Sequence, residues 1–236
     1  MPSEYSQIEE RLNAVEERIA AALQRSGRAR PEITLVAVSK KFSATAIRAA
    51  YQAGIRNFGE NYVQEFAEKR LELVDLIDAR FHLIGHLQSN KARSACQLFD
   101  TIHTADSIKL LWRLDASANE LGRKLEVLLE VKLSGEATKS GAAEEEIPGL
   151  LEVAAKCQNL DVPGLMVIPP WTENAEDSRP YFRRLAELAR RYRLSALSMG
   201  MSNDFEVAIE EGASIVRVGT AIFGKRPPVS RPASSG

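Results

Sequence analysis

The chain has 236 residues, a length that suits one domain or two small ones. Lys and Arg number 31 against 32 Asp and Glu, so the net charge of −1 gives no electrostatic sign of a nucleic-acid or membrane partner. Hydrophobic residues at 44% and charged residues at 27% are typical of a folded globular protein. The two cysteines, Cys96 and Cys157, exclude a disulfide framework and a cysteine metal cluster, which suits a reducing cytoplasm.

The first 26 residues predict an amphipathic helix rather than a targeting segment. Apolar residues recur at helical spacing from Ile8 to Leu23, and Ser26-Gly27 ends the pattern. The segment is charged and lacks the apolar core and cleavage site of a signal peptide. No run in the sequence approaches the roughly 18 apolar residues of a membrane span. We therefore expect a cytoplasmic protein with no membrane partner.

After this helix, short apolar segments alternate with helical patterns. The predicted strands are 33–40, 55–58, 81–84, 99–102, 125–131, 161–167, 195–198 and 214–218. The predicted helices between them lie near 44–54, 60–77, 89–96, 106–121, 143–157, 174–192 and 203–211. Repeated strand–helix units form parallel sheets with right-handed crossovers, and eight units close naturally into a (β/α)8 barrel.

An open, doubly wound sheet is the alternative to the barrel. No G-x-G-x-x-G or phosphate-binding loop follows the first predicted strand, which argues against that alternative. We expect one α/β domain, a (β/α)8 TIM barrel with an extra N-terminal helix, over 1–226. The Pro- and Ser-rich segment 227–236 is expected to be a flexible tail.

Lys40 ends the first predicted strand, and the carboxyl ends of barrel strands carry the active site. The period of two groups Lys40 with Val36 and Val38. If those valines face the barrel interior, the lysine stands in the mouth. Partial desolvation there disfavours the ammonium and frees the amine to form a Schiff base with an aldehyde. A solvated lysine at a strand end is the alternative.

The following strand ends carry polar side chains that each allow two interpretations. Asn61 either caps the next helix or forms a hydrogen bond with a ring hydroxyl or aldehyde oxygen. His82 and His86 are four residues apart, but Gly85 and the strand-to-turn pattern argue against the helix that a metal-binding pair needs. We therefore expect no metal there, and expect His82, Gln88 and Asn90 to satisfy buried or loop polar groups.

The ends of the last two predicted strands suggest an anion site. Gly219 and Thr220 follow strand 214–218, and Ser202 or Asn203 caps helix 203–211. Free backbone N–H groups at two adjacent helix starts suit a phosphate, and the hydroxyls of Ser202 and Thr220 add donors. Barrels often bind a phosphate after strands seven and eight. Two capped turns without a ligand are the alternative.

Arginines raise two further questions. Arg217 interrupts an apolar strand, where a charge is costly unless it is paired, and a pyridine nitrogen or a carboxylate would serve as its acceptor. The six arginines of segment 179–193 are interspersed with Glu187. With a net charge near zero, this pattern favours a solvated helix face over a nucleic-acid interface.

Seven segments carry a family resemblance. They are ITLVAVSKKFSATAI, IRNFGENYVQE, FHLIGHLQSNK, TKSG, GLMVIP, SMGMSNDFEVAI and VRVGTAIFG, in order from 33 to 224. They resemble the YggS/PROSC family of pyridoxal phosphate homeostasis proteins over nearly the whole chain, and GENYVQE and LSMGMSND are its specific signatures. The resemblance implies the fold-type III barrel, similar to the amino-terminal part of alanine racemase.

The resemblance also implies pyridoxal 5'-phosphate (PLP) as the cofactor and assigns residues to it. Lys40 matches the lysine that forms the internal aldimine, and Arg217 matches the arginine that faces the pyridine nitrogen. The other implied cofactor-binding residues are Asn61, Met166, Ser202, Gly219 and Thr220, with Lys139 and Met201 as further candidates. No catalytic residue and no metal ligand is implied.

These residues suggest a PLP carrier that acts in intracellular PLP homeostasis and delivers the cofactor to apo-enzymes. A PLP-dependent amino-acid racemase is the alternative, but a racemase needs an acid or base on each face of the carbanion. Lys40 is one candidate, and no further domain is expected to supply the other. An arginine on the ring nitrogen also leaves the ring a weaker electron sink. A barrel that binds another phosphorylated metabolite is the third interpretation. We expect a monomer.

Overall fold

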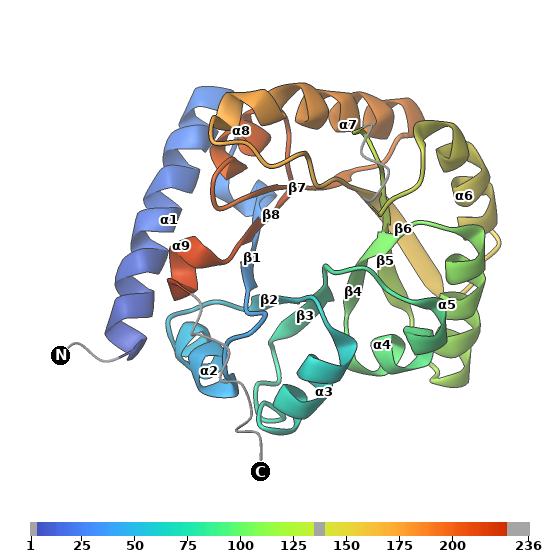
Figure 1. Cartoon of the computed structure of the whole chain (residues 1–236), viewed down its shortest axis with the longest axis horizontal. Coiled ribbons are helices and arrows are strands. Elements are labelled where there is room, and N and C mark those ends of the chain that lie inside the picture. The colour runs from blue at the N-terminus through green and yellow to red at the C-terminus, as the bar shows by residue number, and fades with distance from the viewer. Residues whose placement is uncertain (1–3, 135–139, 226–236) are drawn as a thin grey trace, which may run out of the picture.

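The computed structural model describes residues 4–134 and 140–225. Eight parallel strands form a closed barrel in chain order, with helices around it (Figure 1). The strands are β1 (Thr34–Val38), β2 (Asn57–Glu60), β3 (Arg80–Leu83), β4 (Thr101–Ala105), β5 (Leu125–Glu130), β6 (Leu160–Met166), β7 (Ala196–Met201) and β8 (Ile215–Val218). Because β8 pairs with β1, the sheet closes on itself. The barrel prediction is confirmed and the open sheet is wrong; the tail predicted over 227–236 lies outside the described ranges.

The α-helices are α1 (Glu4–Ser26), α2 (Ala44–Gln52), α3 (Val63–Leu71), α4 (Ala92–Leu98), α5 (Ile108–Glu120), α6 (Ile147–Ala154), α7 (Arg179–Tyr192), α8 (Phe205–Glu210) and α9 (Thr220–Phe223). Short 3-10 turns are η1 (Arg30–Glu32), η2 (Ser89–Lys91), η3 (Glu144–Glu146) and η4 (Ala175–Ser178). None of these helices combines the length and apolarity that crossing a membrane requires.

Several helices begin later than the sequence predicts. The segments near 143–157 and 174–192 each open with a 3-10 turn, and the α-helix follows. Pro148 and Pro180 lie in the first turns of α6 and α7, where the missing N–H of proline costs no hydrogen bond. Neither 3-10 turn contains a glycine or proline, so the sequence does not separate it from the α-helix that follows.

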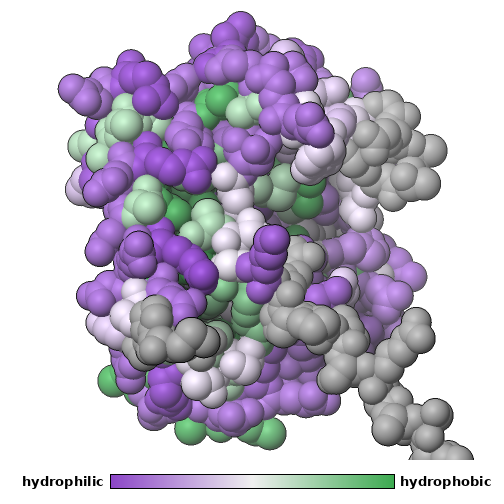
Figure 2. Space-filling view, turned by 60° about the vertical axis from the view of Figure 1, so that its left-hand side comes forward, coloured by the Kyte–Doolittle hydropathy of each residue, from purple (hydrophilic) through white to green (hydrophobic). Residues whose placement is uncertain are grey.

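The helix α1 takes the place of a full eighth outer helix. The last helix, α9, has only four residues, which is too short to cover the seam between β8 and β1. In Figure 1, α1 runs along this side of the barrel, and it contacts α2, α8 and α9. Figure 2 brings the α1 side forward, and hydrophilic side chains dominate this face. The apolar face of α1 therefore lies inward, where Val15 and Ile19 are buried.

Two apolar layers hold the barrel. The larger layer lies between the strands and the helices, and a small cluster of Val36, Leu128, Met166 and Ile215 forms the other. Strands β1 and β5 stand on opposite sides of the barrel, so Val36 and Leu128 meet through its interior. A Cβ built on Gly59 would lie 3.0 Å from the Val36 side chain and 3.5 Å from that of Val38. Both valines therefore face inward, as the prediction for Lys40 assumes.

Candidate functional site

Four neighbouring strands bring the predicted residues to one rim of the barrel. Lys40 follows β1, Asn61 follows β2, Ser202 follows β7, and Gly219 and Thr220 follow β8. These strands are consecutive around the closed sheet, in the order β7, β8, β1 and β2. Their carboxyl ends lie on the same face because all the strands are parallel. The two methionines end adjacent strands of this rim, and Lys139 lies outside the described residues.

Lys40 leaves the sheet at the first turn after β1. The strand ends at Val38, and the Ser39 N–H still donates to the Gly59 carbonyl at 2.9 Å. Lys40 is half-buried, and Lys41 after it has a left-handed backbone with φ of 67°. This turn separates Lys40 from the exposed Lys41. By the alternation of the strand, Lys41 belongs with the residues that face away from the barrel interior.

The turns after β7 and β8 meet at Ser202 and Gly219. The Gly219 N–H donates to Ser202 Oγ at 3.2 Å. A Cβ on Gly219 would lie 3.3 Å from the Val38 carbonyl oxygen, so glycine allows the ends of β8 and β1 to approach closely. No hydrogen bond among the described residues uses the N–H groups of Thr220 and Ala221, and Thr220 is exposed. These amides and hydroxyls form a donor-rich pair of turns.

The predicted cap of the helix after β7 is wrong. The N-cap of α8 is Asp204, and its Oδ1 accepts the Met201 N–H at 2.7 Å. The Asn203 side chain instead donates to the Thr172 carbonyl at 3.1 Å. The turn needs glycine at Gly200, because φ there is +90° and a Cβ would lie 2.5 Å from the Ala208 side chain. The Ser202 hydroxyl is therefore not engaged as a helix cap.

Arg217 lies inside the barrel, and no carboxylate among the described residues pairs with it. It pairs in register with Val36, which faces the interior, and it is 3% exposed. Its Nη1 donates to Ser198 Oγ at 2.6 Å and its Nη2 to the Val167 carbonyl at 2.9 Å. Burial lowers the pKa of Arg217 to about 10, against the opposing influence of the Asp204 and Glu130 carboxylates. The ion pair considered as an alternative does not form among the described residues.

A chain of hydrogen bonds runs from Arg217 across the interior. Beyond Ser198, His103 Nδ1 lies 2.8 Å from the serine oxygen, His103 Nε2 lies 3.0 Å from His82 Nδ1, and His82 Nε2 lies 3.0 Å from Asn57 Oδ1. The Asn57 oxygen can only accept, so His82 carries its proton on Nε2. It follows that His103 donates to His82, and the Ser198 hydroxyl donates to His103.

Burial keeps the imidazoles of His82 and His103, the two in this series of hydrogen bonds, neutral. It lowers the pKa of His82 to about 3, with the nearby Arg80 charge contributing, and it lowers the pKa of His103 well below its usual range. The expectation that His82 satisfies buried polar groups is confirmed. The roles of His103 and Ser198 were missed. Both residues occupy the alternate positions of their strands that face the barrel interior. The alternation within one strand does not show which of its two faces is the interior one, so the sequence alone did not identify them.

A 280 Å³ pocket opens at the mouth beside Asn61 and Glu130. The Oδ1 atom of Asn61 and the Oε2 atom of Glu130 are buried and find no hydrogen-bond partner among the described residues. The pKa of Glu130 is raised to about 7, first by burial and then by the Asp106 carboxylate, while the Arg217 charge opposes the rise. The N-cap of α3 is Tyr62, so the capping role considered for Asn61 is wrong. Both orphan oxygens fit a bound ligand that donates to them.

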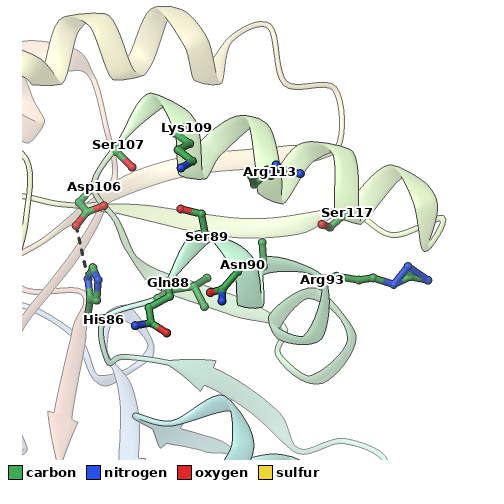
Figure 3. Close-up of a pocket in the computed structure, with 12 residues that line it drawn as sticks. His86, Gln88, Ser89, Asn90, Arg93, Asp106, Ser107, Lys109, Arg113 and Ser117 are labelled. Carbon is green, nitrogen blue, oxygen red and sulfur yellow. Dashed lines mark ion pairs between the residues drawn. The ribbon is translucent and has the colours of Figure 1, made fainter.

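A second cleft, of about 730 Å³, lies between segment 86–93 and helix α5 (Figure 3). His86 lines both cavities, and its Nδ1 lies 3.7 Å from Asp106 Oδ2. Gln88 and Asn90 also line the cleft. His86 is half exposed on this rim, whereas His82 is buried inside the barrel, so the two histidines occupy different environments.

The arginine-rich helix is α7, and several of its arginines meet carboxylates. Arg179 contacts Glu210 and Glu211, at 2.8 and 2.9 Å. Arg184 contacts Glu144 at 2.6 Å. Charges that are paired in this way agree with a solvated helix face.

Comparison with known proteins agrees with this geometry. The family model of the alanine racemase N-terminal domain matches residues 11–227. The chain belongs to this family. A pyridoxal phosphate homeostasis protein of Aquifex aeolicus is 45% identical over 223 residues, covering 92% of this chain and 97% of the relative. The corresponding protein of Pseudomonas aeruginosa is 44% identical, covering 94% and 96%.

The fold also matches a solved relative. The structure of PipY from Synechococcus elongatus with PLP bound has a TM-score of 0.81 and 42% identity, and it covers 92% of this chain and 100% of PipY. The family resemblance drawn from the sequence motifs is therefore confirmed. So is the expectation of an alanine-racemase-like barrel.

Proposed function

We propose that this protein binds PLP at the barrel mouth and acts in PLP homeostasis, with Lys40 as the amine that holds the aldehyde. The observation that carries the proposal is PipY, which is 42% identical over 92% of this chain and has a structure with PLP bound. When bound, PLP supplies an aldehyde, a pyridine nitrogen that accepts hydrogen bonds, and a phosphate dianion. The mouth of this barrel offers complementary groups for each.

The residues of the rim fit these three groups separately. Lys40 is half-buried at the mouth, where a partly desolvated amine suits an aldehyde. Ser202 and Thr220 present hydroxyls suited to a phosphate, and the N–H groups of Thr220 and Ala221 have no partner among the described residues. Gly219 joins the two turns through its N–H to Ser202 Oγ. Asn61 lines the mouth pocket, and its buried Oδ1 has no hydrogen-bond partner among the described residues. We assign Met166 and Met201, which end β6 and β7, to the apolar surroundings of the ring.

Arg217 supports a holding role rather than a catalytic one. A guanidinium only donates hydrogen bonds, so it suits an unprotonated pyridine nitrogen. An unprotonated ring withdraws electrons weakly and stabilises a substrate carbanion poorly. We therefore propose a carrier that keeps PLP available to apo-enzymes.

The role of Lys40 is tested by trapping. Protein mixed with PLP and reduced with borohydride should carry a phosphopyridoxyl group on the peptide that contains Lys40. Lys40→Ala should lose both this adduct and the long-wavelength absorption of bound PLP. Lys41→Ala, a change at the exposed neighbour, should keep both. Equal modification of wild type and Lys40→Ala would refute the assignment.

One observation favours the racemase as a second candidate. Glu130 lies in the mouth pocket, and its pKa of about 7 suits a general acid or base at neutral pH. A racemase would exchange the α-proton of an amino acid in deuterated water at a rate on the order of 1 s⁻¹ or more. Exchange in the wild type that is lost in Glu130→Gln would support the racemase. The absence of exchange with every amino acid tested would exclude the racemase and favour the carrier.

A further inference from the structure

The turn that carries Lys40 rests on a buried charged cluster outside the barrel. The cluster consists of Ser39, Glu60, Glu65 and Lys69, from the end of β1, the end of β2 and helix α3. Glu60 is fully buried, and the Lys69 side chain is 11% exposed. The Lys69 ammonium lies 2.9 Å from Glu60 Oε1 and 2.7 Å from Glu65 Oε1. One cation therefore joins two carboxylates.

Three contacts of this cluster reach the residues on both sides of Lys40. The Lys69 ammonium donates to the Ser39 carbonyl at 3.1 Å, and the Ser39 hydroxyl donates to Glu60 Oε1 at 2.8 Å. On the other side, the Lys41 N–H donates to Glu65 Oε1 at 2.6 Å. The backbone before and after Lys40 is thus held from two other elements.

The conformation of the turn explains why such support is needed. Lys41 has a left-handed backbone, which costs a residue other than glycine free energy unless its surroundings hold it there. Glu60 in turn is costly to bury without its cation, and burial raises its pKa despite the Lys69 charge. Removing one member therefore loosens the rest.

We propose that Lys69 and Glu65 are positioning residues for Lys40, which they act on through the backbone of residues 39 and 41. This inference rests on the proposed function, in which Lys40 holds the aldehyde. Attack on an aldehyde requires the amine to be held close to the carbonyl carbon, so looser backbone support slows covalent attachment. Binding of the phosphate and ring depends on other residues and is spared.

The test compares PLP with 4-deoxypyridoxine 5'-phosphate, an analogue that lacks the aldehyde. Lys69→Met removes the ammonium and keeps most of the stem, and we expect it to attach PLP at least tenfold more slowly. Glu65→Ala removes the acceptor of the Lys41 N–H, and its partly exposed site tolerates the change; we expect a severalfold slower attachment. Both variants should bind the analogue within twofold of wild type.

The matched control is Arg48→Met. Arg48 joins α2 to the chain after α3, through Asp75 at 2.6 Å and the Glu72 carbonyl at 2.7 Å. It should attach PLP at the wild-type rate. Wild-type attachment rates in both cluster variants, or equal losses for PLP and the analogue, would overturn the inference. Lys40→Ala that still attaches PLP would instead refute the proposed function, so the two failures are distinguishable.

Discussion

The main residue-scale feature of this barrel is a buried charge, Arg217, that pairs with no carboxylate in the described part of the chain. Arg217 is stabilised inside by neutral acceptors, and Ser198 passes the hydrogen bond on to His103. The hydrogen bonds that link Arg217, Ser198, His103, His82 and Asn57 remove part of the penalty for burying these polar groups. Ser198 is central because its oxygen accepts from Arg217 while its proton goes to His103.

We expect Ser198→Ala to lower the free energy of unfolding by about 2–5 kcal/mol, because it removes the buried partner of both Arg217 Nη1 and His103 Nδ1. Urea denaturation measures this loss. Ser178→Ala is the control, since the Ser178 hydroxyl is equally buried but has no hydrogen-bond partner among the described residues. If the two serine variants lose the same stability, the hydrogen-bond chain is not what stabilises Arg217.

The raised pKa of Glu130 predicts a pH dependence of stability. Its value of about 7 in the folded protein exceeds the usual 4.5, so the folded state holds a proton that the unfolded state has released between these values. Stability from this group is therefore present below about pH 4.5 and is lost as the pH rises toward 7. The loss reaches about 3 kcal/mol.

Glu130→Gln isolates this contribution, because glutamine resembles the protonated acid and does not titrate. The unfolding free energy of wild type minus that of the variant should fall between pH 4.5 and 7.5. Denaturant titrations at several pH values give this difference. A difference that stays flat, or that rises with pH, would show that Glu130 is ionised in the folded protein.

At the scale of elements, the order of strands and helices follows from the sequence, but several boundaries do not. The apolar, β-branched segments predicted all eight strands, because buried parallel strands need that composition. The 3-10 turns before α6 and α7 were predicted as helix, since neither Glu144–Glu146 nor Ala175–Ser178 contains a residue that breaks a helix. The cap at Ser202 or Asn203 was wrong because Asp204 also suits that role and only the folded turn selects it.

The candidate site likewise contains residues that the sequence predicts and residues that it does not. Residues directly after strands, such as Lys40, Gly219 and Thr220, were predictable because parallel strands place their carboxyl ends on one rim. The cluster of Glu60 and Lys69 was not, since it depends on how α3 packs against the end of β1. The orphan oxygen of Glu130 likewise depends on the depth of the mouth pocket. The order of the strands predicts which residues lie on the rim, whereas the packing of the helices determines which side chains support those residues.

At the scale of the whole molecule, the barrel is one closed ring whose seam is β8 with β1. The proposed phosphate turns and Lys40 lie on the two sides of this seam. Helix α1 covers it in place of the short α9. Arg18 of α1 also contacts Glu206 of α8 at 2.6 Å, and its guanidinium lies 4.4 Å from the centre of the Phe205 ring. The first helix thus joins the last units of the barrel to the first.

Ile19→Ala tests whether α1 is part of the closed barrel or an appendage. Ile19 is fully buried on the inward face of α1, so the change should cost about 2–5 kcal/mol of unfolding free energy. Because the seam closes the ring, the loss should appear in a single unfolding transition that also abolishes the proposed PLP binding. Leu71→Ala, at an apolar side chain that is 77% exposed, should change stability by less than about 0.5 kcal/mol. A separate early transition in Ile19→Ala, with PLP still bound, would mean that α1 unfolds alone and that the other elements hold the seam.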